Sequence, residues 1–404
     1  MVDGQIGSMQ PDELRFLLSP DGRAALAELA AAPPTPDSHM AVAALWRERL
    51  GPERAQAALE VALLRQRAER KFSRAAEMLF TREGLEQATA EPVADHRAAR
   101  FAAAGVRTVA DLGCGIGGDA LALAGAGADV VAIDRDPLRL LMAKANAAVY
   151  GLTEHLALVQ ADLLALPPLP VDAFFFDPAR RAGGGPRGAP SRRLHTAATY
   201  QPPLTLFDVW RQVVPQGAAK VSPGIDYAEL PSDVEVEIVS LAGEVKEAVL
   251  WSGTLRTAAR RATLLPGGYT LSGDAGESAP VAAPRAYLYE PDGAVIRAHL
   301  VARLATRIDA TLIDPQIAYL TADAAQPTPF ARAFAIDDHF PFQLKRLRAY
   351  LRQRGIGRVT IKKRGSPLEP EALRQALRLR GDNEAVLFLT QVMGRHTVLI
   401  GRAI

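Results

Sequence analysis

The pattern of apolar positions divides the chain into a helical beginning and a longer region of alternating strands and helices. Over residues 10–90 apolar residues recur every three or four positions, which is the period of amphipathic helices, with breaks at residues 33–38 and at Gly51-Pro52. From residue 106 short apolar runs alternate with helix-like segments. This alternation predicts an α/β fold with a parallel sheet, whose ligands bind at the carboxyl ends of the strands.

The alternating region is predicted to hold five strands and a closing hairpin. We expect the strands at 106–113, 129–136, 156–164, 171–178 and 217–225, the hairpin at 234–253, and helices at 118–128, 137–152 and 203–214. Residues 264–284 are rich in Gly, Pro, Ser and Ala, as domain boundaries often are. The resulting prediction is an N-terminal helical domain at 1–90, a Rossmann-like α/β domain at 91–263, a linker with a small α/β segment at 264–335, and a small basic α+β domain at 336–404.

Charge changes this picture at the C-terminal end. Residues 341–380 hold twelve Lys or Arg and two Glu, a local charge of +10, so the rest of the chain sums to −8. Basic charge concentrated beside an acidic remainder is typical of a module that binds a polyanion, although a solvated Arg-rich helix face has the same composition. We expect Lys362, Lys363 and Arg364 to contact such a partner.

Composition narrows the class of protein. Apolar residues make up 49% and charged residues 23%, values of an ordinary globular protein, and no apolar run reaches the roughly 18–20 residues needed to span a bilayer. The first residues lack the basic and apolar regions of a secretion signal. The single Cys forms no internal disulfide, and the seven His show no ligand spacing. We therefore expect a cytoplasmic protein with no membrane partner and no metal.

A glycine-rich loop joins the first predicted strand to its helix. In the sequence VADLGCGIGGD, residues 109–119, Gly113, Gly115 and Gly118 have GxGxxG spacing, which lets a ligand approach the backbone closely. The spacing alone fits a nicotinamide dinucleotide equally well. Asp111 argues against that ligand, because a carboxylate in the cleft repels a pyrophosphate and favours the ammonium group of a methionine moiety.

Three further carboxylates end the next three strands. Asp134 lies where it can accept two hydrogen bonds from a ribose diol, and Asp162, with Leu163 beside it, lies where it can accept from an adenine amino group. Asp177 ends the fourth strand, beside the expected position of a reactive methyl group. Any one of these acids could simply cap a helix. Together with Asp111 they predict S-adenosylmethionine as the cofactor.

The same stretches resemble a known family. DLGCGIGGD, AIDRD, QADLL and DPAR resemble motifs I to IV of the class I S-adenosylmethionine-dependent methyltransferases, over about residues 106–252. The resemblance implies that the cofactor lies against Asp111, Gly113, Gly115 and Asp134, with Asp162 near the adenine.

The whole chain is similar to bacterial class I methyltransferases with a C-terminal THUMP-like domain. The stretches that carry this similarity include FFFDPARR, AAKVSPGID and PFQLKRLRAYLRQRGIGRVTIKKRG, and the lead-in KFSRAAEMLFTREGLEQATAEPVADH distantly resembles that of trimethylguanosine synthases. THUMP domains help RNA-modifying enzymes to hold RNA. The resemblance therefore implies an RNA substrate, either tRNA or rRNA.

The end of the fourth strand indicates the type of acceptor. Methyltransferases that act on exocyclic amines have an Asp-Pro-Pro stretch followed by an aromatic residue here, whereas this chain has Asp177 and Pro178 followed by Ala179 and Arg180. We place Asp177, Pro178 and Arg180 at the catalytic centre, with Asp177 orienting the acceptor. Methylation at C5 of a pyrimidine is disfavoured, because it needs a cysteine nucleophile and the only one, Cys114, lies in the glycine loop.

An arginine-rich stretch follows this strand end. Guanidinium groups bind phosphates with two parallel hydrogen bonds, so we expect this stretch to hold the anionic part of the substrate. The residues expected there are Arg181, Arg192 and Arg193, together with Arg187. Tyr200 and His195 are candidates for stacking on a base. Lys220 has two interpretations: the favoured one is a surface lysine at a strand end, and the alternative is a lysine that reaches the cleft.

Three functions fit these residues. The leading hypothesis is an RNA methyltransferase. The second is a methyltransferase for a small anionic molecule, with the C-terminal unit serving assembly. The third is a non-catalytic RNA-binding protein that retains the cofactor for stability.

Overall fold

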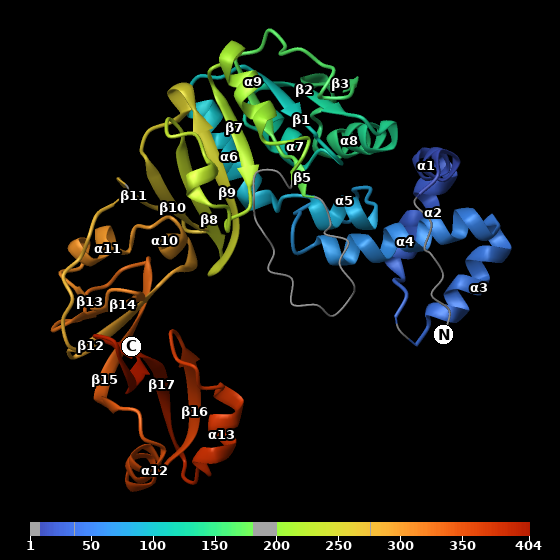
Figure 1. Cartoon of the computed structure of the whole chain (residues 1–404). Helices are drawn as coiled ribbons and strands as arrows, with labels where there is room; N and C mark the ends of the chain where they lie inside the picture. Colours follow the sequence, from blue (N-terminus) through green and yellow to red (C-terminus); the bar gives the residue numbers. More distant parts are fainter. Residues whose placement is uncertain (1–8, 36, 181–199, 275) are drawn as a thin grey trace. The chain divides into compact units, whose positions relative to one another are not determined.

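The chain forms two compact units in a computed structural model that describes residues 9–35, 37–180, 200–274 and 276–404 (Figure 1). The first unit runs to Val234 and also includes Leu250–Arg256, and the second comprises Glu235–Val249 and Thr257–Ile404. The four-domain division made from the sequence stays a prediction. Each unit is described by itself below.

The first unit begins with the predicted helices. Proline at the first helical turn starts several of them, and the Ser19 side chain caps α2 by accepting a hydrogen bond from the Gly22 amide at 3.2 Å. The apolar faces of the first five helices form one buried core with Ile116 and Met142 of the following α/β region. The helices are α1 (Pro11–Leu18), α2 (Pro20–Ala31), α3 (His39–Leu50), α4 (Pro52–Ala68), α5 (Arg82–Gln87) and α6 (Glu91–Ala103).

A parallel sheet follows in the same unit. Its strands lie in the order β7-β4-β1-β2-β3, so β1 has β2 on one side and β4 on the other. Such a reversal of strand order opens a crevice at the carboxyl ends of the strands, where ligands bind in α/β folds. The strands are β1 (Thr108–Leu112), β2 (Asp129–Asp134), β3 (Leu156–Gln160), β4 (Ala173–Phe176) and β7 (Gly217–Val221).

Helices and short elements complete this unit. The β4 strand is buried throughout, and the Phe174 ring lies 5.5 Å from the Trp210 ring on α9. The sequence prediction missed a two-stranded ribbon, because its strands are only two residues long. The elements are α7 (Gly118–Gly125), α8 (Pro137–Tyr150), α9 (Thr205–Val213), the ribbon strands β5 (Ala179–Arg180) and β6 (Tyr200–Gln201), and 3-10 turns at Thr153–His155, Tyr227–Glu229 and Gly253–Leu255.

The second unit contains the predicted hairpin. It also contains the strand β11, which lies within residues 264–284, where the sequence predicted a domain boundary. The hairpin turns at Ala242 and Gly243, both with positive φ (53° and 82°). β11 lies at the end of the strand order β11-β10-β8-β9 and pairs antiparallel with β10. The elements are β8 (Glu235–Leu241), β9 (Glu244–Ser252, whose last three residues belong to the first unit), β10 (Arg260–Leu265), β11 (Tyr269–Gly273), α10 (Gly293–Arg297) and α11 (Val301–Arg307).

A seven-stranded mixed sheet ends the second unit. Its order is β13-β14-β12-β15-β18-β17-β16, and α12 and α13 pack on β16 (Figure 1). Strands from both sides of the predicted boundary at residue 335 therefore share one sheet. The elements are β12 (Tyr287–Pro291), β13 (Thr311–Asp314), β14 (Ile317–Ala322), β15 (Ala331–Pro341), α12 (Leu344–Gln353), β16 (Ile356–Lys363), α13 (Pro370–Leu377), β17 (Asn383–Val392) and β18 (Arg395–Ala403).

The order of the elements agrees with the sequence prediction. The predicted α/β fold, with helices before it and a small α+β region after it, is confirmed. In the described part of the chain, no helix combines the length and the apolar character needed to cross a membrane.

Candidate active site

The glycine loop between β1 and α7 has the backbone that its sequence predicts. Gly113 and Gly115 both have positive φ (91° and 57°), and the amides of Gly113 and Cys114 donate to the Ile133 carbonyl at 2.9 Å. A Cβ atom on Gly113 would lie 3.4 Å from the Asp177 carbonyl oxygen, whereas one on Gly115 would meet no atom within 4 Å. The loop therefore approaches the end of β4 closely and leaves open space above Gly115, while Gly118 begins α7.

Asp111 on β1 has a buried carboxyl group without a hydrogen-bond partner among the described residues. Its side chain is only 1% exposed. Burial raises its pKa to about 7, and the nearby Asp177 and Asp134 carboxylates add to the shift, while Arg97 opposes it. Such a carboxylate favours a cation that brings hydrogen-bond donors into the crevice.

Asp134 and Asp162 end the neighbouring strands β2 and β3. The Asp134 carboxylate is 6% exposed and accepts from the amides of Gly115 at 3.0 Å and Asp136 at 2.9 Å, so it holds the glycine loop in place. Asp162 is exposed and accepts from the Leu164 amide at 3.0 Å, which gives it a local turn-capping role. Leu163 beside it is 7% exposed.

Asp177 follows β4 and is paired with a lysine that the sequence prediction placed on the surface. The Lys220 Nζ atom, at the end of the adjacent strand β7, lies 2.7 Å from Asp177 Oδ2, and only 20% of the Lys220 side chain is exposed. The expectation of a surface lysine is therefore wrong. The pairing of β4 with β7 brings the two residues together, and this pairing is not visible in the local sequence.

Lys220 is also the start of a hydrogen-bonded chain into the helical region. Its Nζ atom donates to Thr89 Oγ1 at 3.1 Å, and the Thr89 hydroxyl donates to Asp119 Oδ2 at 2.9 Å. The other Asp119 oxygen accepts from Arg97, which is 1% exposed and lies 4.3 Å from the Phe175 ring centroid. The sequence prediction missed Thr89, Asp119 and Arg97. The only sequence signal was the Asp that closes the glycine-rich stretch.

Two of the other residues predicted near β4, Pro178 and Tyr200, are buried. Arg180 pairs through its backbone with Tyr200 across the β5–β6 ribbon. The Tyr200 ring is 3% exposed, and its hydroxyl accepts from the Ser222 amide at 2.7 Å, so this ring lies in the wall of the site. The predicted residues Arg181, Arg187, Arg192, Arg193 and His195 lie outside the described residues.

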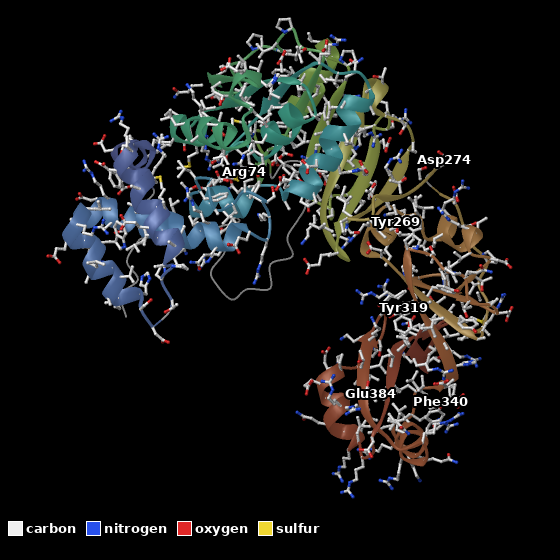
Figure 2. The ribbon with its side chains drawn as sticks, turned by 180° about the vertical axis from the view of Figure 1, so that it is seen from behind. Arg74, Tyr269, Asp274, Tyr319, Phe340 and Glu384 are labelled. Carbon is white, nitrogen blue, oxygen red and sulfur yellow. The ribbon has the colours of Figure 1, made fainter. Side chains whose placement is uncertain are left out.

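The C-terminal cations predicted to bind the substrate have partners within the second unit. Lys362 is paired with Glu290, and Lys363 is 2.7 Å from Glu369. The Arg364 guanidinium lies 5.1 Å from the ring centroid of Tyr319, a residue labelled in Figure 2. Other cations of this region are exposed and have no carboxylate within 4 Å in the described chain: Lys345, Arg346, Arg352, Arg354, Arg378 and Arg380. Two of them also contact aromatic rings: Arg346 lies 4.1 Å from the Phe340 centroid and Arg354 lies 3.7 Å from the Tyr350 centroid.

The glycine loop also contains a buried cysteine, Cys114. Burial raises the pKa of the Cys114 thiol well above its ordinary value, so this thiol is a poor nucleophile. Groups of three or more His, Cys, Asp or Glu that could hold a metal ion are absent from the residues that the structure covers.

Comparisons with known proteins agree with this geometry. A protein of Mycobacterium tuberculosis named as an S-adenosylmethionine-dependent methyltransferase is 38% identical over 361 residues, 86% of this chain and 95% of that protein. The chain belongs to the S-adenosylmethionine-dependent methyltransferases. A solved structure from Porphyromonas gingivalis W83 has the same fold as this chain, with a TM-score of 0.75 and 23% identity. The similarity covers 94% of this chain and 98% of that one.

Family models match three parts of this methyltransferase. "RNA cap guanine-N2 methyltransferase" matches residues 106–200, "THUMP domain-like" matches 331–403, and a domain of unknown function matches 10–68. A cobalt-precorrin-6B C(15)-methyltransferase from Pyrobaculum aerophilum is 39% identical over 87 residues, 20% of this chain and 42% of that protein. The resemblance to methyltransferases with a THUMP-like domain is thereby confirmed.

The crevice suits the cofactor of this methyltransferase family. The unpaired, buried carboxylate of Asp111 matches the ammonium group of a methionine moiety, and the space above Gly115 leaves room for a ligand. Asp134 uses each oxygen once, for a backbone amide, and each oxygen can accept a second hydrogen bond from a ribose hydroxyl. The residues present therefore fit S-adenosylmethionine.

Proposed function

We propose that this S-adenosylmethionine-dependent methyltransferase acts on a nucleotide in RNA, either tRNA or rRNA. The observation that carries the proposal is the position of Asp177-Pro178, which ends β4 beside the glycine loop and is held there by Lys220. The matches to an RNA cap guanine-N2 methyltransferase model and to a THUMP domain-like model support RNA as the substrate class. Each match covers only part of the chain.

In this proposal Asp177 orients the acceptor and receives its proton. Asp177 Oδ2 is occupied by the Lys220 ammonium, which leaves Oδ1 to accept a hydrogen bond from an amine or hydroxyl of the nucleotide. The cofactor supplies an electrophilic methyl group. Because the reaction is an in-line displacement, the main task of the protein is to hold the acceptor atom in line, and the ion pair fixes the carboxylate for that purpose.

RNA is held, in this proposal, by exposed cations of the second unit. Lys345, Arg346 and Arg352 on α12 are exposed and have no carboxylate within 4 Å in the described chain, so their charges are available to phosphates. The predicted contacts Lys362 and Lys363 are already paired with Glu290 and Glu369. We therefore assign the larger part of the phosphate contacts to α12.

The experiment that tests the proposal is mass spectrometry of nucleosides from purified tRNA and rRNA, in cells with and without the gene. We expect one methylated nucleoside to disappear on deletion and to return with the wild-type chain but not with Asp177→Asn. Asp129→Asn is the matched control, because Asp129 is exposed at the amino-terminal end of β2, whereas Asp177 lies at the carboxyl ends of the strands of the same sheet. An unchanged nucleoside profile would overturn the RNA proposal and leave a small-molecule acceptor to be sought.

A further inference from the structure

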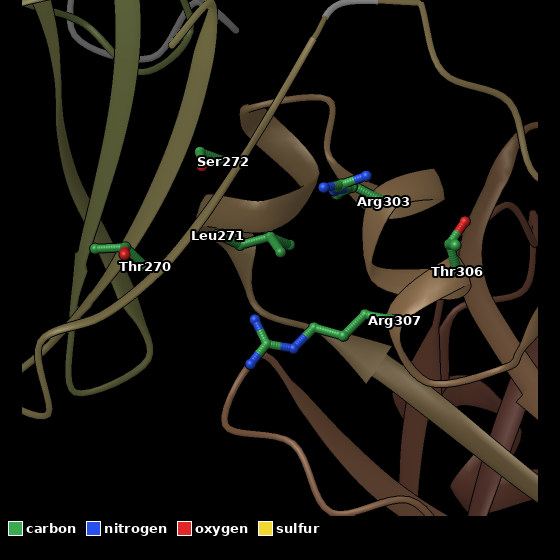
Figure 3. A pocket seen from close by; sticks show the side chains of 6 residues that line it. All are labelled: Thr270, Leu271, Ser272, Arg303, Thr306 and Arg307. Atoms are coloured by element: carbon green, nitrogen blue, oxygen red, sulfur yellow. The ribbon is translucent and has the colours of Figure 1, made fainter. Parts of the chain in front are cut away.

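A polar cleft lies between the terminal strand β11 and the helix α11 of the second unit (Figure 3). Its volume is about 430 Å³, which falls within the range of roughly 300–1,000 Å³ typical of ligand sites. The lining residues are Thr270, Leu271, Ser272, Arg303, Thr306 and Arg307. The cleft is separate from the methyltransferase crevice, because all of its residues belong to the second unit.

Two arginines give this cleft its charge. Arg303 and Arg307 lie one helical turn apart on α11, and Figure 3 shows both side chains extending toward β11. Neither has a carboxylate within 4 Å among the residues that the structure describes. Two like charges four residues apart destabilise a helix when nothing neutralises them.

The helix stabilises the positive charge of Arg307 but not that of Arg303. Arg307 is in the last turn, where a cation interacts favourably with the helix dipole, and its guanidinium lies 5.1 Å from the Phe330 ring centroid. Arg303 is the third residue of the same helix, where the dipole disfavours a positive charge. A bound anion would offset both the repulsion between the two guanidinium groups and the unfavourable position of Arg303.

The outer edge of β11 adds hydrogen-bond donors to the cleft. β11 pairs only with β10 in the described sheet, so the peptide groups on its outer edge are available to a ligand. The Glu277 carboxylate lies beside Gly273 but not within ion-pair distance of Arg303.

We propose that this cleft binds a phosphoryl group. Guanidinium groups bind phosphate oxygens in pairs, and the lining contains no aromatic ring on which a base could stack, so the cleft fits a phosphate and not a nucleobase. Within the RNA methylation proposed above, on which this assignment of the source rests, the group is a backbone phosphate of the substrate. A free phosphoryl anion has the same chemistry.

The experiment compares Arg303→Gln/Arg307→Gln with Arg374→Gln/Arg402→Gln in the full chain. The control arginines are exposed in the same unit, but each is paired with a carboxylate, Glu371 or Asp337. Both double variants remove two positive charges. Binding of a short fluorescent single-stranded RNA is measured by anisotropy over a series of salt concentrations, and binding of inorganic pyrophosphate is measured by calorimetry.

We expect the Arg303/Arg307 variant to bind RNA more weakly, with a plot of log affinity against log salt about 1.4 units shallower, since each lost phosphate contact removes about 0.7 for single strands. The control should change the slope by less than half as much. If RNA binding is unaltered but pyrophosphate binding is lost in the Arg303/Arg307 variant, the cleft takes a free phosphoryl anion.

Two results separate this proposal from the proposed function. Wild-type protein that binds pyrophosphate but no RNA, with the pyrophosphate binding lost in the Arg303/Arg307 variant, would support the cleft and contradict the RNA substrate. Identical behaviour of the two double variants in both titrations would overturn the cleft. Circular dichroism and an unchanged affinity for the cofactor show that each variant is folded.

Discussion

Burial opposes the negative charge of the Asp111 carboxylate. Its carboxyl pKa is 3.8 in the unfolded chain and about 7 in the folded protein. The folded state therefore binds this proton more tightly than the unfolded state does. Its contribution to stability falls as the pH rises from about 4 to about 7 and changes little above that range.

Replacement of Asp111 by Asn should remove this dependence. We expect Asp111→Asn, without cofactor, to be more stable than wild type at pH 8, by up to roughly 4 kcal/mol, and nearly equal to it near pH 4. The same change should weaken S-adenosylmethionine binding, because the partner of its ammonium group loses its charge. Urea unfolding across pH and calorimetric titration measure the two effects. Equal stability of the two proteins at pH 8 would contradict the assignment.

Lys220 is a positioning residue for Asp177, and its removal should affect turnover more than cofactor binding. Lys220→Met keeps the apolar stem but leaves the carboxylate without its ammonium partner. We expect kcat to fall by roughly 10- to 100-fold, as for a lost charged hydrogen bond of about 1.5–3 kcal/mol, with the cofactor Kd within about twofold of wild type.

Two further variants make this test specific. Lys220→Arg, which retains the charge, should recover part of the rate. Lys144→Met is the control, because Lys144 is exposed on α8. A large change in cofactor affinity in Lys220→Met, with kcat unaltered, would show that the ion pair serves the cofactor side instead.

The sequence predicted the residues at strand ends better than the contacts between them. Asp111, Asp134 and Asp177 could be identified because each ends a strand whose apolar run is visible, and the structure gathers them at one edge of the sheet. The contacts of Lys220 and Thr89 depend on strand pairing and on packing of the helical region. Such contacts join residues 131 positions apart and leave no local pattern.

Among the elements, α12 and β16 illustrate how charge alone can mislead. Both are basic in sequence, but the cations of β16 are paired within the unit, whereas several cations of α12 are exposed. Composition cannot separate the two cases, because the partner Glu290 lies on β12, far away in the sequence. The short β5–β6 ribbon and the strand β11 were missed for a related reason: pairing with another strand defines them, and their own residues do not.

Removal of the positive charges of α12 and of those at β16 should have different effects. Lys345→Gln/Arg346→Gln/Arg352→Gln on α12 should weaken RNA binding and make its salt slope about 2 units shallower, as for three lost phosphate contacts. Lys362→Gln/Lys363→Gln/Arg364→Gln should retain most of the affinity but lower Tm, because Glu290, whose side chain is 18% exposed, loses its partner. Anisotropy and thermal unfolding measure these effects. If the Lys362/Lys363/Arg364 variant instead loses more RNA affinity than the α12 variant, the phosphate contacts would be assigned to β16.

At the scale of the whole molecule, the helical beginning and the α/β sheet share one core. Apolar side chains of α1–α4, including Trp46 and Leu64, lie in the same buried cluster as Met142 of α8. The sequence predicted both regions but not their common core, because helix periodicity shows which face is buried and not what covers it. Loss of the first helices therefore exposes apolar surface of the α/β region.

A chain that begins at residue 91 should consequently be less stable than the full chain. We expect its Tm to be lower by roughly 10 °C or more, since uncovering even two large core side chains costs about 5 kcal/mol. It should also lose turnover, because Thr89 is absent. Differential scanning calorimetry of the two chains, with a chain beginning at residue 9 as the control, makes the comparison. A Tm equal to that of the full chain would show that the helical region is dispensable for folding.

The hydrogen-bonded chain from Arg97 through Asp119, Thr89 and Lys220 to Asp177 also constrains how such a protein can be recombined. The recognisable motifs lie between residues 106 and 252, and a gene fusion or a designed chimera would naturally be cut at their edges. A cut there separates Thr89 and Arg97 from the lysine and the two carboxylates that they serve. The segment that keeps this site intact is therefore longer than the motifs. An N-terminal segment exchanged between relatives must include Thr89 and Arg97.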